Sequence, residues 1–199
     1  MERFNRLLNF IGEYETEEEL ISYIVEECSL DELIYDYHDY DIAKPESHKT
    51  IGIELEVAYV DMIDLVEASL EDIVASRINE DVTYTTECNL IASYDSTVYG
   101  VGGVEFITHP KAPENTLRDI KILLNNVSCE SHEEAGLHVH FSKSYWNYNE
   151  QLMNRFIIIM SMWRRFIQTI SHRDYDKWEE WSKTNISTKS QANELLNCQ

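Results

Sequence analysis

The sequence predicts an α+β protein in which a β-sheet is flanked by helices and preceded by a helical extension. Short segments with apolar residues at every second position, such as residues 51–57, are typical of strands. Longer segments with apolar residues at a period of 3.6, such as residues 116–127, are typical of helices. The first 48 residues contain helix signals and lack strand alternation. A chain of 199 residues is long enough for one domain with a core and such an extension.

The expected organisation has three parts. An acidic helical extension covers residues 1–48, the α+β domain covers residues 49–183, and a polar C-terminal tail covers residues 184–199. Within the extension, Thr16 and Ser29 are each followed three residues later by a glutamate, which is the spacing of a capping box at the start of a helix. Two helices are therefore expected before the first strand.

The same two periodicities predict the elements of the α+β domain. Helices are expected from Asp61 or Asp64 to about residue 78, and at residues 116–127 and 149–171. Strands are expected at residues 51–57, 82–86, 89–94, 104–108 and 137–141. The apolar stripes of the second and third helices are expected to be buried; they contain Leu117, Ile120, Leu123, Leu124 and Val127, and then Leu152, Phe156, Ile159, Met160, Trp163, Ile167 and Ile170. Three glycines, Gly100, Gly102 and Gly103, indicate tight turning or close approach of the backbone before residue 104.

Charge is distributed unevenly along the chain. The formal net charge is −21. Residues 1–90 carry 24 acidic and 5 basic side chains, a net −19, whereas residues 142–199 carry 6 acidic and 8 basic side chains, a net +2. The acidic part would repel nucleic acid and anionic membrane surfaces, so direct binding to either is not expected. Solubility alone is the commoner explanation of such an excess.

The cysteine pattern and the apolar runs predict a soluble cytoplasmic protein. Four cysteines lie far apart without a C-x-x-C pair, and no secretory signal precedes them, as is typical of reduced thiols; they are Cys28, Cys88, Cys129 and Cys198. The most apolar run, residues 156–163, is flanked by arginines and is too short to span a membrane.

The first strand carries two glutamates on one face. In I-G-I-E-L-E-V the apolar residues at odd positions would face a core, so Glu54 and Glu56 would stand together on the opposite face. Like charges placed side by side repel each other, and a hard cation such as Mg²⁺ would cancel that repulsion. The alternative is a half-exposed sheet whose glutamates are solvated.

Two later strands offer matching groups. Glu105 lies in V-E-F-I-T, and His138 and His140 alternate with apolar residues in G-L-H-V-H-F-S. Taken singly, Glu105 is explained as an edge residue and the histidines as hydrogen-bonded imidazoles. An antiparallel sheet could bring all five side chains onto one face as a cation site rich in carboxylates and assisted by histidine.

The order of these motifs resembles the amidoligase family. The matching segments, between residues 49 and 175, are I-G-I-E-L-E-V, Y-D-S before V-E-F-I-T-H-P, A-G-L-H-V-H-F-S and, after the long helix, H-R-D-Y. These are carboxylate-amine ligases related to glutamine synthetase and glutamate-cysteine ligase, found often in phage and bacterial gene neighbourhoods. The resemblance implies a curved antiparallel sheet of the glutamine-synthetase catalytic type that holds Mg²⁺ or Mn²⁺ and ATP. It further implies amide formation through an acyl phosphate, from a small-molecule or peptide carboxylate and an amine.

The resemblance also implies roles for individual residues. Metal ligands are implied at Glu54, Glu56, Glu105 and His138. Nucleotide contacts are implied for His138, His140 and Arg173. Catalytic roles are implied for Glu105, for Asp95, which would orient the amine, and for Arg173, which would meet the phosphates.

Two other functions remain open. The acidic front and a chain that ends soon after Arg173 are also compatible with a ligase-derived scaffold without turnover. Such a protein could imitate nucleic-acid phosphate and bind a basic partner such as a nuclease, as anti-restriction and anti-CRISPR proteins do. A metal hydrolase built on E-x-E and H-x-H is less favoured, because no H-E-x-x-H motif is present.

Overall fold

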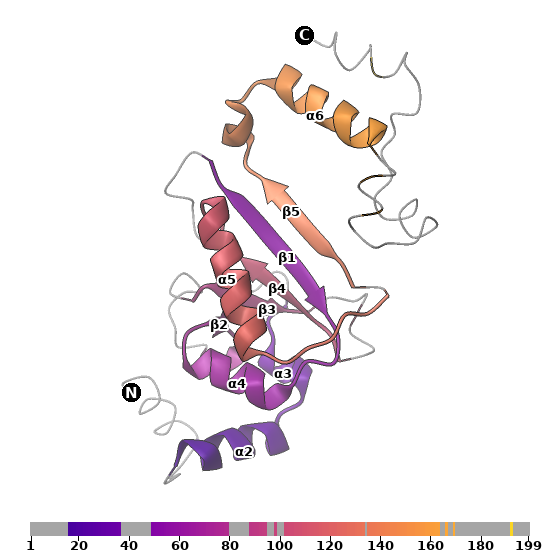
Figure 1. Cartoon of the computed structure of the whole chain (residues 1–199). Helices are drawn as coiled ribbons and strands as arrows, with labels where there is room; N and C mark the ends of the chain where they lie inside the picture. The colour runs from indigo at the N-terminus through magenta and orange to yellow at the C-terminus, as the bar shows by residue number, and fades with distance from the viewer. Residues whose placement is uncertain are drawn as a thin grey trace. The chain divides into compact units, whose positions relative to one another are not determined.

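The chain forms two compact units, Met1–Ser142 and Lys143–Gln199. The structure is a computed structural model, and it describes residues 16–36, 49–79, 88–94, 98, 102–133, 135–163, 166, 169 and 192. The first unit contains a five-stranded sheet and its helices (Figure 1). The second unit contains a short 3₁₀ helix and one α-helix among the residues described.

The sheet of the first unit has the strand order β2-β3-β4-β1-β5. Its strands are β1 (Ile51–Val57), β2 (Val74–Ala75), β3 (Leu90–Ser93), β4 (Val104–Thr108) and β5 (Leu137–Phe141). The neighbours of β1, which are β4 and β5, both pair with it antiparallel, and β3 pairs antiparallel with β4. The short β2 instead pairs parallel with β3. The predicted α+β class is confirmed, with a sheet that is mostly rather than entirely antiparallel.

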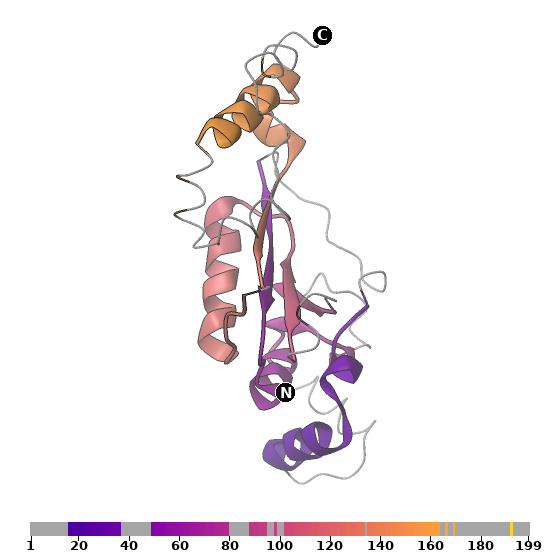
Figure 2. The same ribbon diagram turned by 90° about the vertical axis from the view of Figure 1, so that its right-hand side faces the viewer.

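One helix, α5 (Pro113–Asn126), covers one face of this sheet and contacts β1 and β4. The helix α4 (Met62–Leu70) contacts α5 and β2, α2 (Glu17–Glu27) packs on α4, and α3 (Leu30–Leu33) contacts residues 77–79. The main core lies between them and the sheet, and Phe106, Leu90 and Val57 are among its buried strand residues. Figure 2 shows the sheet nearly edge-on, with α5 running along one face. Because strand side chains alternate between faces, the opposite face is available for the polar residues of β1, β4 and β5.

The helix starts predicted at Thr16, Ser29 and Asp61 are confirmed. The hydroxyl of Thr16 accepts a hydrogen bond from the backbone N–H of Glu19 at the start of α2. Ser29 and Glu32 form the capping box of α3. The carboxylate of Asp61 caps α4 by accepting from two backbone N–H groups of the first turn. Each cap satisfies donors that a helix leaves unpaired at its N-terminus.

The predicted end of the helix at residues 61–78 is wrong, because α4 stops at Leu70. Asp72 adopts a left-handed conformation with φ of 63°. The N–H of Asp72 then donates to Ser69 O, and the N–H of Ile73 donates to Ala68 O, which is the Schellman pattern of a helix end. Residues 74–75 pair with β3, and residues 77–79 form the 3₁₀ helix η1 (Arg77–Asn79).

The predicted burial of α5 is partly wrong. The helix starts three residues earlier than expected, with Pro113 in its first turn, and its inner face presents Thr116, Asp119 and Leu123. Leu117 and Leu124, expected in the core, are 58% and 53% exposed. Asp119 lies on the inner face, where its Oδ2 is 2.6 Å from Nζ of Lys111, so this face combines polar and apolar residues.

Apolar residues of β5 and of the second unit are also more exposed than predicted. Every residue of β5 is exposed, including Leu137, Val139 and Phe141. In the second unit, α6 (Glu150–Met162) follows η3 (Lys143–Trp146), and none of the described residues of α6 is buried. The predicted burial of Leu152, Ile159 and Trp163 is therefore wrong.

Some predictions fall outside the residues that the structure describes. These are the strand at residues 82–86, Gly100, most of residues 164–171, and Asp95 and Arg173 of the predicted site. Among the described residues, Cys28, Cys88 and Cys129 are not in disulfide bonds. Within the same described ranges, no helix has the length and apolar character needed to cross a membrane.

Candidate metal site

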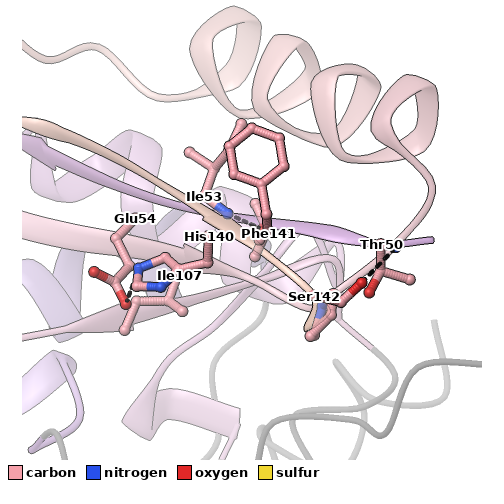
Figure 3. Close-up of a pocket in the computed structure, with 10 residues that line it drawn as sticks. Thr50, Ile53, Glu54, Ile107, His140, Phe141 and Ser142 are labelled. Atoms are coloured by element: carbon pink, nitrogen blue, oxygen red, sulfur yellow. Dashed lines mark hydrogen bonds and ion pairs between the residues drawn. The ribbon is translucent and has the colours of Figure 1, made fainter. Parts of the chain in front are cut away.

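The strand β1 directs its glutamates away from the main core. Val57 is buried among the helices, and Leu55 packs against the same cluster. The two-residue alternation of a strand then places Glu54 and Glu56 on the other face. Ile53 and Phe141 point to the helix side of the strands, while Glu54 and His140 lie together on the opposite side (Figure 3).

The strand register brings the other three side chains beside these glutamates. Glu54 is paired with His138 of β5, and Glu56 is paired with Glu105 of β4. His140 lies opposite Gly52, one alternation further along the same face. Because β1 lies between β4 and β5, the three strands present their polar groups side by side. The structure therefore brings together Glu54, Glu56, Glu105, His138 and His140.

Contact distances show that this is one cluster. His138 Nδ1 lies 3.2 Å from Glu54 Oε2, and His138 Nε2 lies 3.6 Å from Glu56 Oε1. His140 Nε2 lies 3.0 Å from the other oxygen of Glu54, Oε1. The carboxylate of Glu54 thus lies between two imidazoles. One ligand atom each from Glu54, Glu105 and His138 lies within 4.8 Å of the other two.

The cluster has a buried side and an open side. The side chains of Glu56 and Glu105 are only 7% and 5% exposed, whereas His138 and His140 are 51% and 61% exposed. Two nearly buried carboxylates on paired positions repel each other more strongly than they would in water. A cation held against them would relieve that repulsion, and the open side would leave coordination positions for water or a ligand.

The donor set fits a divalent cation of the Mn²⁺ or Mg²⁺ type. Carboxylates suit Mg²⁺ and Mn²⁺, and an imidazole ligand makes Mn²⁺ the better match. In an octahedral site with bonds of about 2.1 Å, ligand atoms lie roughly 3.0 to 4.2 Å apart. The ligand atoms of Glu54, Glu105 and His138 all lie within 4.8 Å of one another, which is close to this range. Small side-chain rotations would close the site around an ion.

A pocket beside this cluster was not predicted from the sequence. It has a volume of about 280 Å³ and adjoins Glu54 and His140 (Figure 3). Thr50, Gly52 and Ser142 also line it. Thr50 and Gly52 lie four and two residues before Glu54, and Ser142 lies two residues after His140, and this alternation is a signal that could have found them. Beside the pocket, Glu54 pairs with Ile107 and Ile51 pairs with Lys111, so two residues of β1 face three of the other segment. This β-bulge is a register feature that no sequence signal specified.

Comparisons with known proteins do not identify the chain. No protein-family model matches it, and no curated protein or solved structure is significantly similar to it.

Proposed function

We propose that this protein is an ATP- and divalent-metal-dependent carboxylate-amine ligase. The observation that carries the proposal is the convergence of ligand atoms from Glu54, Glu105 and His138, which come from three strands, within 4.8 Å of one another. The motif order of the sequence, which resembles the amidoligases, supports this reaction class over other metal-dependent reactions. The acyl-phosphate route needs a cation to neutralise nucleotide phosphates, and this cluster can hold one.

The described residues divide into two groups under this proposal. Glu54, Glu105 and His138 hold the cation, and Glu56 adds negative charge behind it. His140 lies on the exposed side, where a phosphate oxygen could reach its imidazole. Asp95 and Arg173 are proposed to orient the amine and to contact the phosphates; both lie outside the described residues.

Trapping of the acyl phosphate tests the proposal. Purified protein is incubated with ATP, Mn²⁺ or Mg²⁺, hydroxylamine and a panel of carboxylates that includes amino acids and peptides. Hydroxylamine captures an acyl phosphate as a hydroxamate, which mass spectrometry detects. We expect hydroxamate that depends on both ATP and metal and that is absent from Glu54→Gln. Metal binding without hydroxamate or ADP formation across the panel would contradict ligase activity.

One observation favours a second candidate, an acidic protein that binds a basic partner. Residues 16–36 carry eight acidic side chains and no basic one, and all eight are exposed; they are Glu17, Glu18, Glu19, Glu26, Glu27, Asp31, Glu32 and Asp36. Such a surface could occupy the basic channel of a nuclease. Its test is inhibition of a nuclease that weakens steeply between low and high salt, because exposed charges are screened. Salt-insensitive ATP turnover would instead support the ligase.

A further inference from the structure

The strand β5 forms one edge of the sheet and is exposed along its whole length. It is the last strand in the order β2-β3-β4-β1-β5, and among the residues that the structure describes no strand pairs with its outer side (Figure 1). All five of its residues are exposed. The strand at the other edge, β2, has two residues, and both are buried. Of the two edges, that of β5 is the one long and open enough for another chain to pair with it.

The register of β5 with β1 shows which backbone groups point outward. Ser142 donates its N–H to Thr50 O on the β1 side, and Gly136 O accepts from an N–H of β1. Successive residues of a strand direct their backbone groups to opposite sides in an antiparallel pair. Leu137 and Val139 therefore direct their N–H and C=O groups away from β1. An added strand could form hydrogen bonds with these groups.

The edge of β5 lacks the features that usually prevent pairing. Its sequence, L-H-V-H-F, contains neither lysine nor proline, and its register with β1 runs without a bulge. The side chains of Leu137, Val139 and Phe141, which share one face, are 57%, 44% and 41% exposed. Natural edge strands are normally protected by charges, prolines or bulges, so an edge without them is expected to have a partner.

The two faces of β5 favour different side chains in that partner. The apolar face favours aliphatic residues, which pack against apolar residues of a neighbouring strand. On the other face, His138 and His140 lie beside Glu54, in the cluster that also contains Glu56 and Glu105. With the histidines counted as neutral, these three carboxylates give the cluster a formal charge of −3. A partner strand with alternating aliphatic and basic residues complements both faces.

A lysine on such a strand is long enough to approach the carboxylates. Neighbouring strands lie roughly 4.8 Å apart, and the four-carbon stem of lysine spans more than this distance. The ammonium group of a lysine opposite β5 can therefore extend over the imidazoles toward Glu54, which is 20% exposed. Aspartate or glutamate at the same position would instead be repelled by the cluster.

A second copy of the chain matches this edge less well. Each copy has a formal net charge of −21, so two copies repel each other. The strand has five residues, whereas a stable interface uses roughly 20 to 30 residues on each side. Short extended peptides, by contrast, bind sheet edges through main-chain hydrogen bonds and contacts of alternate side chains. Charge and size therefore both favour a basic peptide segment.

We propose that β5 binds an extended basic peptide segment as an added antiparallel strand, with the aliphatic residues of the segment beside Leu137 and Val139. Its lysine or arginine residues then lie beside His138 and His140. In this pairing the residues directly opposite Leu137 and Val139 exchange hydrogen bonds with them, so the aliphatic residues supply the bonding N–H groups. The inference does not depend on the ligase function, because a ligase with a peptide substrate and an acidic protein with a basic partner could both use this edge.

Fluorescence anisotropy with labelled peptides tests the proposal on the full chain. The peptide V-K-V-K-V-K-V has the proposed alternation, and V-V-K-K-K-V-V has the same composition and charge without it. Titrations contain EDTA, so the result does not depend on the metal site, and about 150 mM salt, which screens distant charges. We expect the alternating peptide to bind about tenfold more tightly than the block peptide. V-E-V-E-V-E-V should bind more weakly than either.

Methylation of the peptide backbone tests whether the peptide adds as a strand. N-methyl groups on the two inner valines remove N–H groups that would bond to β5, and should weaken binding about tenfold. N-methyl groups on two lysines alter N–H groups that point away from β5, and should change affinity by less than about threefold. This comparison uses wild-type protein.

Val139→Pro tests the same contact from the side of the protein. Proline removes the outward N–H of residue 139 without removing a hydrogen bond to β1, as edge strands tolerate. The variant should bind V-K-V-K-V-K-V about fivefold more weakly. Val139→Thr keeps the N–H and the branched side chain, and should remain within about twofold of wild type. If Val139→Pro does not fold, the methylated peptides still decide.

The outcomes that would overturn the proposal are distinct. Equal affinity for the alternating and block peptides, or equal losses from the two methylation patterns, would exclude strand addition. Tighter binding of V-E-V-E-V-E-V than of V-K-V-K-V-K-V would exclude a basic partner. A dimer in light scattering that Val139→Pro dissociates would show that a second copy occupies the edge instead.

Discussion

Glu105 of β4 lies directly opposite Glu56 of β1, and both side chains are more than nine-tenths buried. Protein interiors rarely place two carboxylates at paired positions of adjacent strands, because the charges repel each other and lose hydration. His138 lies 3.6 Å from Glu56 and 3.2 Å from Glu54, so the strand on the other side of β1 adds an imidazole to the same cluster. This arrangement carries the proposed metal site.

The Glu105→Gln variant should distinguish a role of Glu105 in binding metal from a role in stabilising the fold. Without metal, the variant should remain folded, because glutamine keeps the size of glutamate and can still form hydrogen bonds. Added Mn²⁺ should raise the unfolding temperature of wild type but not of Glu105→Gln, since a ligand that binds the folded state stabilises it. Thermal denaturation with and without Mn²⁺ measures both effects.

Glu67→Gln is the matched control for this variant. Glu67 is an exposed residue of α4 outside the cluster, so its change should leave the Mn²⁺-induced shift intact. An equal Mn²⁺-induced shift in Glu105→Gln and wild type would exclude Glu105 as a ligand.

Thr108→Val should destabilise the first unit by about 1 to 3 kcal/mol, because it leaves the buried N–H of Ile53 without its acceptor. Thr108→Ser keeps the hydroxyl and should remain close to wild type, apart from the loss of one methyl group. Urea denaturation measures both free energies of unfolding. Equal stability of the valine and serine variants would show that the hydroxyl does not support the bulge.

Gly103→Ala should be strongly destabilising. A Cβ at this position would lie 2.5 Å from both the Cβ and the carbonyl oxygen of Val98, so the backbone itself would have to move. We expect a cost of roughly 1 to 3 kcal/mol, as for other overpacked sites. Gly52→Ala is the control for loss of a glycine, because its Cβ has room. Similar costs for the two variants in urea denaturation would contradict the close approach at Gly103.

The stability that the capping box of α3 contributes should decrease at low pH. Hydrogen bonds from the backbone N–H and the hydroxyl of Ser29 hold the pKa of Glu32 below its ordinary value of 4.5. A lowered pKa means that the carboxylate contributes stability above the ordinary pKa, and that this contribution is lost as pH falls through the lowered value. The NMR titration midpoint of Glu32 should lie below 4.5.

Ser29→Ala should raise this midpoint only part of the way, because the backbone N–H remains and is the larger cause. A wild-type midpoint at or above the ordinary value would show that the capping box does not form in solution.

Local periodicity predicted the parts of the fold that depend on neighbouring residues. The alternation in I-G-I-E-L-E-V placed β1 and the direction of Glu54 and Glu56, and the capping residues Thr16 and Ser29 marked two helix starts. These features are readable because each is set within a few residues of chain. The strand register depends on residues far apart in the chain and cannot be read from local sequence. The pairing of Glu56 with Glu105 could therefore be anticipated only as one possible arrangement of a sheet.

The predictions of the end of α4 and of the burial of α5 were wrong for physical reasons that hydrophobic periodicity does not reveal. The apolar spacing continued beyond Leu70, but Asp72 accepts a left-handed conformation and ends α4. The inward face of α5 includes Asp119, which pairs with Lys111 eight residues away in sequence, whereas Leu117 is exposed, and apolar periodicity alone does not predict this. The bulge that opens the pocket depends on how β4 meets β1, which is a tertiary relationship.

Pulsed EPR of Mn²⁺ bound to the purified protein tests the central claim most directly, because a directly coordinated imidazole gives a nitrogen hyperfine coupling. We predict such a coupling in wild type and in His132→Ala, a control outside the cluster, and its loss in His138→Ala together with Mn²⁺ affinity at least tenfold weaker. Tight Mn²⁺ binding without nitrogen coupling, or coupling that persists in His138→Ala, would contradict a metal site built on Glu54, Glu105 and His138.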